Sequence, residues 1–140
     1  MSVVSKLVIP SDPDRLVEVD AFAEERIARL DFSQDQRDDI AISLSEAVNN
    51  AILHGNKGDM EKTVTIVLEE KKDALRIEVV DQGDGFEVTE VADPTDPENL
   101  LAESGRGLLI IRHLMDEVNV TPTHHGTTVE LIKRYNSKAN

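Results

Sequence analysis

A carboxylate and an amide occur four residues apart, at Glu46 and Asn50, in a stretch whose pattern predicts a helix. Residues at this spacing share one helical face, so both side chains point into the same space. The carboxylate can accept a proton, and the amide oxygen can bind Mg²⁺. An ordinary solvated helical face carries the same kind of pair, so the pair by itself does not assign a function.

A second group of residues with chemical potential is DQGDGF, in which Asp81 ends an apolar strand and Gly83 and Gly85 follow. Glycine permits positive φ and close backbone approach to a ligand. The Asp81 carboxylate can accept a hydrogen bond from an exocyclic amine, which suits adenine. A glycine-rich turn with Asp81 capping nearby amides explains the same residues structurally.

The third group is SGRGLLIIRHL, where Gly105 and Gly107 are expected to lead directly into a helix. The free amides at the start of a helix form an anion site, and phosphates fit there. Arg106 adds a planar donor that is always charged. Capping of the helix is an equally simple reason for the two glycines.

Alternating apolar residues predict five strands that must position these groups. They cover 3–9, 63–70, 74–81, 118–122 and 126–134, and the second and third form an antiparallel hairpin. Helices are predicted after a cap at Asp12 or Asp14, over about 35–53, at 97–102 and from about Gly107. The glycine-rich and acidic stretch 81–107 is long enough to indicate a functional loop or lid.

The helix over 35–53 is predicted to have two chemically different faces. The apolar face comprises Ala41, Leu44, Val48 and Ala51, and the polar face comprises Ser43, Glu46, Asn50 and His54. A histidine at the end of a helix often only satisfies the helix dipole, so His54 ranks below Glu46 and Asn50 as a site residue. The polar face is the one expected to carry function.

These elements predict an α+β fold, a two-layer sandwich with helices on one face of a mixed, mostly antiparallel sheet. The 140 residues fit one domain, 1–140, and the 39% hydrophobic and 31% charged residues are typical of a globular protein. We see no internal repeat.

The net charge of −13 argues against nucleic acid as a partner, because a phosphate backbone would be repelled. A nucleotide would have to bind through local backbone donors and a metal ion. The absence of cysteine fits a reducing compartment, and no segment resembles a signal peptide or a membrane span. The default expectation is a soluble cytoplasmic protein that does not bind membranes.

The order of the motifs is more informative than any one of them. EAVNNAILHGN, DQGDGF, SGRGLLIIRHL and GTT follow one another between Glu46 and Lys133. This series resembles the GHKL ATPase superfamily, and specifically the bacterial anti-sigma factor serine kinases. The stretch DPTDPENLLAESGRGL is similar to the ATP lid of that subgroup. The resemblance implies a Bergerat-type ATP-binding fold with ATP and Mg²⁺ as cofactors.

The resemblance also implies roles for single residues. Glu46 would be the catalytic base, Asn50 would coordinate Mg²⁺, and Asp81 would recognise the adenine amine beside Gly83 and Gly85. The residues that would border the phosphates are Gly105, Arg106, Gly107 and Leu108. Thr127 or Thr128 would approach the adenine from the last strand, and spacing does not decide which. His54 either lines the site or merely finishes its helix.

By resemblance, the protein phosphorylates a serine of a STAS-type anti-sigma factor antagonist and sequesters a sigma factor by partner switching. The alternative is an ATP-dependent binding module without kinase activity. A histidine kinase domain would need a helical segment with a phosphoacceptor histidine, for which we see no room before Glu46. Hydrolysis of ATP by water stays open, because Glu46 could equally orient water. Family members often act as homodimers, but no stripe in the sequence identifies a dimer face.

Overall fold

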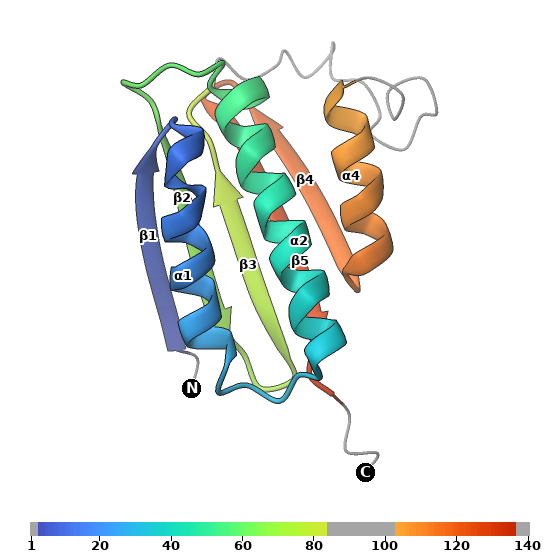
Figure 1. The fold of residues 1–140 in the computed structure, drawn as a ribbon. Helices are drawn as coiled ribbons and strands as arrows, with labels where there is room; N and C mark the ends of the chain where they lie inside the picture. Colours follow the sequence, from blue (N-terminus) through green and yellow to red (C-terminus); the bar gives the residue numbers. More distant parts are fainter. Residues whose placement is uncertain (1–2, 84–102, 137–140) are drawn as a thin grey trace.

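The computed structural model describes residues 3–83 and 103–136, except for the side chains of 103–106. Figure 1 shows the arrangement of its elements. In chain order they are β1 (Val3–Pro10), a 3-10 turn (Pro13–Arg15), α1 (Leu16–Ile27), α2 (Gln34–Asn50), a π turn (Ala51–Gly55), β2 (Thr63–Glu70), β3 (Ala74–Val80), α4 (Glu103–Leu114), β4 (Glu117–Thr123) and β5 (Gly126–Arg134). The five predicted strands are therefore confirmed, whereas the helix predicted over 97–102 lies outside the described residues.

The five described strands form one sheet in the order β1-β2-β3-β5-β4. Every neighbouring pair in this sheet is antiparallel. The expectation of a mixed, mostly antiparallel sheet is therefore corrected to a fully antiparallel one. Two features explain this difference. Between β1 and β2 the chain passes through two oppositely directed helices, α1 and α2, which return it to the end it left (Figure 1). β5 then inserts between β3 and β4, which would otherwise lie side by side and parallel.

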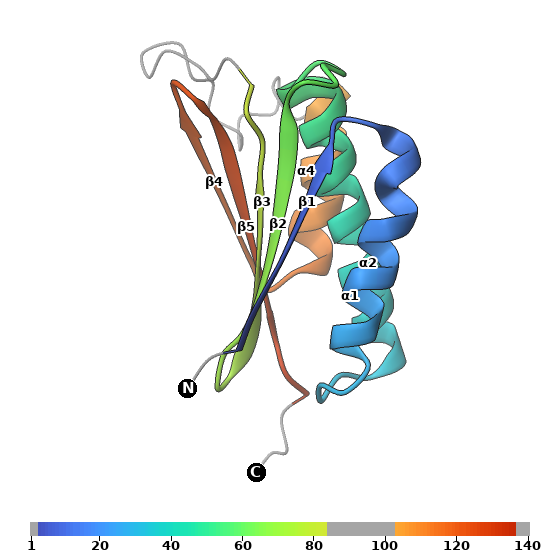
Figure 2. The same ribbon diagram turned by 90° about the vertical axis from the view of Figure 1, so that its left-hand side faces the viewer.

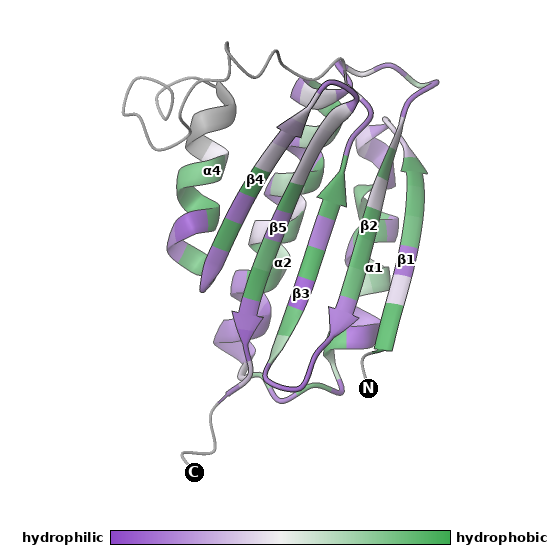
Figure 3. Ribbon diagram, turned by 180° about the vertical axis from the view of Figure 1, so that it is seen from behind, coloured by the Kyte–Doolittle hydropathy of each residue, from purple (hydrophilic) through white to green (hydrophobic). Residues whose placement is uncertain are grey.

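The helices lie on one face of the sheet, and the two-layer α+β sandwich is confirmed (Figure 2). Hydrophilic and hydrophobic residues alternate along the strands (Figure 3), because successive side chains of a strand point to opposite faces. The inward positions predicted for the hairpin are all buried in the core. They are Val64, Ile66, Leu68, Leu75, Ile77 and Val79.

The opposite face of the sheet carries charged groups around Arg76 of β3. The Arg76 guanidinium donates hydrogen bonds to Glu130 of β5 and, at 2.6 Å, to Glu78 of its own strand. The hydrogen bond from Arg76 lowers the pKa of the Glu130 carboxyl. Opposite charges across neighbouring strands stabilise the pairing and keep this face polar.

Local caps start the first two helices. The Asp12 carboxylate accepts a hydrogen bond from the Asp14 N–H at 3.0 Å and caps the 3-10 turn before α1, as predicted. α2 starts with a capping box that the sequence analysis missed, in which Ser33 and Gln36 exchange hydrogen bonds between side chain and backbone. Both caps satisfy amides that the first turn of a helix leaves without partners.

The predicted phase of α2 was wrong at Ala41, and the predicted polar face is more covered at Ser43 than a solvated helix face would be. Ala41 is exposed rather than apolar-facing, because Ile40 takes the core position and its successor lies about 100° round the helix. Ser43 lies on the same face as Glu46 and Asn50, as predicted, but it is fully buried. It lies one turn before Ala47, on the side that packs against α4. The helix also ends earlier than predicted, at Asn50, and continues as the π turn.

Lys133 of β5 connects the sheet to two helices. Its side chain is almost fully buried, and the Nζ ammonium donates a hydrogen bond to the Leu114 carbonyl at the end of α4. The same ammonium lies 3.4 Å from the Asp39 carboxylate of α2. A cation at the C-terminal end of a helix also interacts favourably with the helix dipole.

Replacing this ammonium tests whether it holds the layers together. Lys133→Met keeps most of the apolar stem but leaves the Leu114 carbonyl without its donor. We expect the free energy of unfolding to fall by about 1–3 kcal/mol in urea denaturation followed by circular dichroism. Asp39→Asn is the control, because that partly exposed pair should cost less than about 1 kcal/mol. Unchanged stability in Lys133→Met would contradict the role of the carbonyl contact.

Candidate functional site

Glu46 and Asn50 face α4 at the point where that helix carries Gly107. A Cβ placed on Gly107 would lie 2.6 Å from Glu46 Oε2 and 2.8 Å from the Asn50 side-chain nitrogen. Only glycine fits this close approach without moving one of the two side chains. Both side chains are half-buried, and neither makes a hydrogen bond to another described residue. Their polar groups are therefore available to a ligand.

Asp81 follows the end of β3 and is buried, with 7% of its surface exposed. Its Oδ1 atom accepts hydrogen bonds from the backbone N–H groups of Gly83 and Thr127, each at 3.0 Å. The Asp81 N–H in turn donates to the Thr127 carbonyl at 3.0 Å. Its Oδ2 atom accepts no hydrogen bond from the described residues, so this oxygen can receive a donor from a ligand.

Three glycines surround Asp81 from different parts of the chain. A Cβ on Gly55 would lie 2.1 Å from Asp81 Oδ2, and one on Gly126 would lie 2.1 Å from the Asp81 carbonyl oxygen. A Cβ on Gly83 would lie 2.1 Å from the Gly55 carbonyl oxygen. Gly126 also has a φ of +146°, which other residues rarely adopt. The π turn, the end of β3 and the start of β5 thus meet around one carboxylate.

The structure distinguishes the two threonines of β5. Thr127 contacts Asp81 through its backbone and lies on the helix-covered face, two positions from Val129, which packs against the core. Thr128 pairs with Val80 and lies on the opposite face, because side chains alternate along a strand. Thr127 is therefore the one beside Asp81. Leu108 of α4 is half-buried and packs against the core.

The glycines of the third motif do not precede their helix as predicted. α4 starts at Glu103, so Gly105 and Arg106 lie in its first turn and Gly107 in its second. The amide of Gly107 is too far along to be one of the free amides at the helix start. Glycine lies inside the helix because the approach of Glu46 and Asn50 leaves no room for a side chain. The side chain of Arg106 and all of Gly85 lie outside the described residues.

His54 lies in the π turn and is exposed. A π turn has more residues per turn than an α-helix, so the four-residue stripe from Glu46 through Asn50 is not continued to His54. π turns within helices are frequent at functional sites. Here the turn brings Gly55 against Asp81.

Sequence reasoning missed the buried polar residues that surround this site. Ser11 and Asn56 are both 1% exposed and hydrogen-bond to each other at 2.8 Å. No periodic pattern in the sequence marks Asn56 as buried, because it follows a π turn in which the four-residue spacing of a helix does not hold. A buried amide requires hydrogen-bond partners, and those partners are far away in sequence.

The donor atoms at Asn50 fit Mg²⁺ bound together with a nucleotide. Among the described residues no group of three or more His, Cys, Asp or Glu side chains could hold a metal ion. Mg²⁺ in nucleotide sites is commonly held by one or two protein oxygens, with phosphates and waters as the other ligands. The Asn50 side-chain oxygen would supply such a ligand, while the side-chain nitrogen lies toward Gly107.

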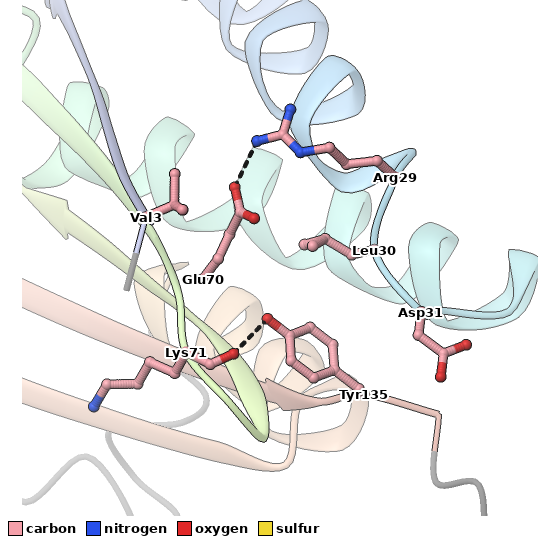
Figure 4. A pocket seen from close by; sticks show the side chains of 7 residues that line it. All are labelled: Val3, Arg29, Leu30, Asp31, Glu70, Lys71 and Tyr135. Carbon is pink, nitrogen blue, oxygen red and sulfur yellow. Dashed lines mark hydrogen bonds and ion pairs between the residues drawn. The ribbon is translucent and has the colours of Figure 1, made fainter. Parts of the chain in front are cut away.

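A cavity of about 320 Å³ lies at the other end of β3, near its turn with β2 (Figure 4). Arg29 and Glu70 form an ion pair across it at 2.8 Å, and the Tyr135 hydroxyl donates to the Lys71 carbonyl at 2.9 Å. Burial, with the nearby Glu70 charge, raises the pKa of Tyr135. None of the predicted site residues lines this cavity. No helix in the described ranges is long and apolar enough to cross a membrane.

Comparison with known proteins places this site in context. The family described as "Histidine kinase-like ATPase domain" matches residues 9–133. An anti-sigma F factor of Anoxybacillus flavithermus is 40% identical over 112 residues, which cover 76% of this chain and 75% of that protein. The serine-protein kinase RsbW of Bacillus subtilis is 30% identical over 139 residues, covering 95% of this chain and 86% of that protein.

Solved structures support the fold. The RsbU and RsbW domains of Rv1364c from Mycobacterium tuberculosis superpose with a TM-score of 0.69 at 20% identity, covering 94% of this chain but only 32% of that one. The histidine kinase domain of the Erythrobacter litoralis EL346 blue-light activated histidine kinase gives a TM-score of 0.58 at 21% identity. That match covers 93% of this chain and 67% of the other. Both likenesses concern the fold alone.

A side chain at Gly55 tests the role of Asp81. The Cβ of Gly55→Ala would overlap Asp81 Oδ2, so the carboxylate or the π turn must shift. If Asp81 recognises adenine, ATP affinity measured by calorimetry should fall about 10-fold, the equivalent of one lost hydrogen bond.

The matched control is Gly58→Ala. Gly58 has a φ of +71° but nothing within 4 Å of an added Cβ. We expect this variant to be less stable by about 1 kcal/mol from backbone strain, with ATP affinity unchanged. An ATP affinity in Gly55→Ala equal to that of the unaltered protein would contradict the placement of adenine beside Asp81.

Proposed function

The chain belongs to the histidine kinase-like ATPase family, and we propose that within it the protein is an ATP-binding anti-sigma factor with serine kinase activity. The observation that carries this proposal is the pairing of Glu46 with Asn50 beside Gly107 of α4. A site that only binds nucleotide needs no carboxylate at that position. The relatives named anti-sigma F factor and serine-protein kinase RsbW support the same function.

The nucleotide would lie between two groups of residues on the helix-covered side of the sheet. Asp81 Oδ2 accepts the hydrogen bond from the adenine amine, while Oδ1 stays bound to the Gly83 and Thr127 amides. Thr127 lies beside the base. Asn50 would hold Mg²⁺ through its amide oxygen, and the α4 residues Gly105, Arg106, Gly107 and Leu108 would border the phosphates.

In the transfer step Glu46 accepts the proton of the serine hydroxyl on the partner protein. The serine oxygen forms its bond to the γ-phosphorus as the bond from that phosphorus to the ADP oxygen breaks. Bound ATP and Mg²⁺ supply the phosphoryl group and neutralise its charge. The protein contributes mainly by positioning these groups.

Two partners follow from the function. We propose that the protein binds a sigma factor, which the name of the relative called anti-sigma F factor supports, and an antagonist that is its kinase substrate. We propose that the antagonist is of the STAS type and carries the phosphorylated serine. ATP and sigma factors are both cytoplasmic, which favours the cytoplasm as the place of action.

The decisive assay combines the protein with Mg²⁺, γ-labelled ATP and the STAS-type proteins of its own genome. We expect label on one serine of one antagonist. Glu46→Gln should reduce the transfer rate by a factor on the order of 10²–10⁴, the usual contribution of a general base, with ATP affinity retained. Transfer at the native rate in Glu46→Gln would reject Glu46 as the base. ATP binding without label on any antagonist would favour a sequestering module instead of a kinase.

The metal role of Asn50 has its own test. Asn50→Ala should remove most of the increase in ATP affinity that Mg²⁺ causes, leaving metal-free binding nearly unchanged. Asn49→Ala is the matched control, because it deletes a neighbouring half-buried amide of the same helix. The measurement is calorimetric titration of ATP with Mg²⁺ and with a chelator. Equal effects of Mg²⁺ in both variants would argue against Asn50 as a ligand.

A further inference from the structure

We infer that Asn56 is a positioning residue that holds Asp81 in place and thereby sets selectivity for a purine with a 6-amino group. The inference rests on the proposed ATP site and adds a determinant of its base selectivity. Asn56 does not itself face the open Oδ2 atom of Asp81. It acts through the backbone segments that hold that carboxylate.

The Asn56 side chain connects three segments of the chain. Its Nδ2 atom donates to Ser11 Oγ at 2.8 Å and to the Thr63 carbonyl at 2.9 Å. Its Oδ1 atom accepts from the Gln82 backbone N–H at 2.7 Å. These partners follow β1, start β2 and follow β3. Both amide hydrogens and the amide oxygen are therefore used.

Further hydrogen bonds close the network. Ser11 Oγ donates to the Lys62 carbonyl at 2.7 Å. Gln82 Oε1 accepts from the Thr63 N–H at 2.7 Å and from its hydroxyl at 3.0 Å. Ser11 and Asn56 are the buried members of this network, and Gln82 lies at its exposed edge. Linked hydrogen bonds restrict the groups that make them, and the loss of a buried member leaves its partners unpaired.

The network is adjacent in sequence to both residues of the close contact between Gly55 and Asp81. Asn56 follows Gly55, and Gln82 follows Asp81, so the Asn56–Gln82 bond fixes the distance between Gly55 and Asp81. Gly55 and Asp81 cannot move closer together without a clash, since even a Cβ on Gly55 would overlap Asp81 Oδ2. On its other side Asp81 is held by Thr127, whose N–H donates to the Asp81 carboxylate and whose carbonyl accepts from the Asp81 N–H.

The backbone of Asn56 also determines where the phosphate side of the site lies. Its N–H donates to the Ala51 carbonyl at 2.8 Å, which closes the π turn directly after Asn50. The same residue thus connects α2, which carries Glu46 and Asn50, to the strand end that carries Asp81. A shift of Asn56 would misplace the carboxylate relative to the phosphate-binding residues.

Base discrimination separates this role from a purely structural one. Inosine triphosphate presents a carbonyl oxygen where ATP presents the 6-amino group, so a rigid Asp81 carboxylate should reject it. The experiment measures the affinity of the full-length protein for ATP and for inosine triphosphate, both with Mg²⁺. Loss of a fixed hydrogen-bonding partner is what relaxes such discrimination.

In Asn56→Ala we expect ATP affinity to fall about 10-fold while affinity for inosine triphosphate changes less than about twofold. The ratio of the two affinities then falls about as far as in Asp81→Asn, which alters the carboxylate directly. A global loss of folded protein would lower both affinities equally. The inference is overturned if the unaltered protein prefers ATP to inosine triphosphate and Asn56→Ala shows the same ratio of affinities. That result leaves the proposed function intact.

Ser11→Ala provides a milder variant in case Asn56→Ala does not fold. It removes one hydrogen-bond partner of Asn56 and leaves the Asn56–Gln82 bond in place. We expect a smaller decrease in the same ratio, about threefold. The same ratio in Ser11→Ala as in the unaltered protein would overturn the inference. Failure of the unaltered protein to bind ATP at all would instead overturn the proposed function on which the inference rests.

Discussion

The site depends on the carboxylate of Asp81, which is held by the backbone and not by a charged side chain. Two N–H groups bind one of its oxygens, and the other oxygen is left for a ligand. In the described part of the chain no Lys or Arg forms an ion pair with this carboxylate, so its second oxygen could accept a hydrogen bond from a ligand amine. The arrangement also requires three backbone segments to meet around one residue, which is possible only because each contributes a glycine.

The close packing around Asp81 also connects the two parts of the site, the Glu46 and Asn50 pair on α2 and the carboxylate of Asp81. α2 presents Glu46 and Asn50, and its π-turn extension delivers Gly55 to Asp81. α4 closes on the first pair through Gly107, while Lys133 holds the far end of α4 and the start of α2 against the sheet. The helices are thus fixed at both ends relative to the strand that carries Asp81. A site that works mainly by positioning needs this rigidity.

The negative net charge of the protein makes short-range contacts more important for binding a nucleotide. With a net charge of −13 the protein repels a nucleotide at long range, so binding must come from groups at short range. Backbone amides and a bound metal ion are groups of this kind, and Asn50 is the residue proposed to hold the metal. Debye screening limits the unfavourable field to about 10 Å at 0.1 M salt, which allows these contacts to dominate.

The sequence by itself determined the elements and the chemical groups of this protein. Alternation located the strands, helical spacing located α1 and α2, and the order of the motifs singled out Glu46, Asn50 and Asp81 as candidate site residues. These signals are local, since a strand or a helix repeats within a few residues. The phase error at Ala41 and the unexpected burial of Ser43 arose because the buried positions of a helix depend on what packs against it.

Only the tertiary structure decided which distant residues meet. It inserted β5 between β3 and β4, made the sheet antiparallel, and placed Thr127 rather than Thr128 beside Asp81. It also paired Asn56 with Ser11, 45 residues away, and Thr127 with Asp81, 46 residues away. Pairings over such separations leave no periodic pattern in the chain. They follow from the requirement that every buried polar group find a partner in the folded protein.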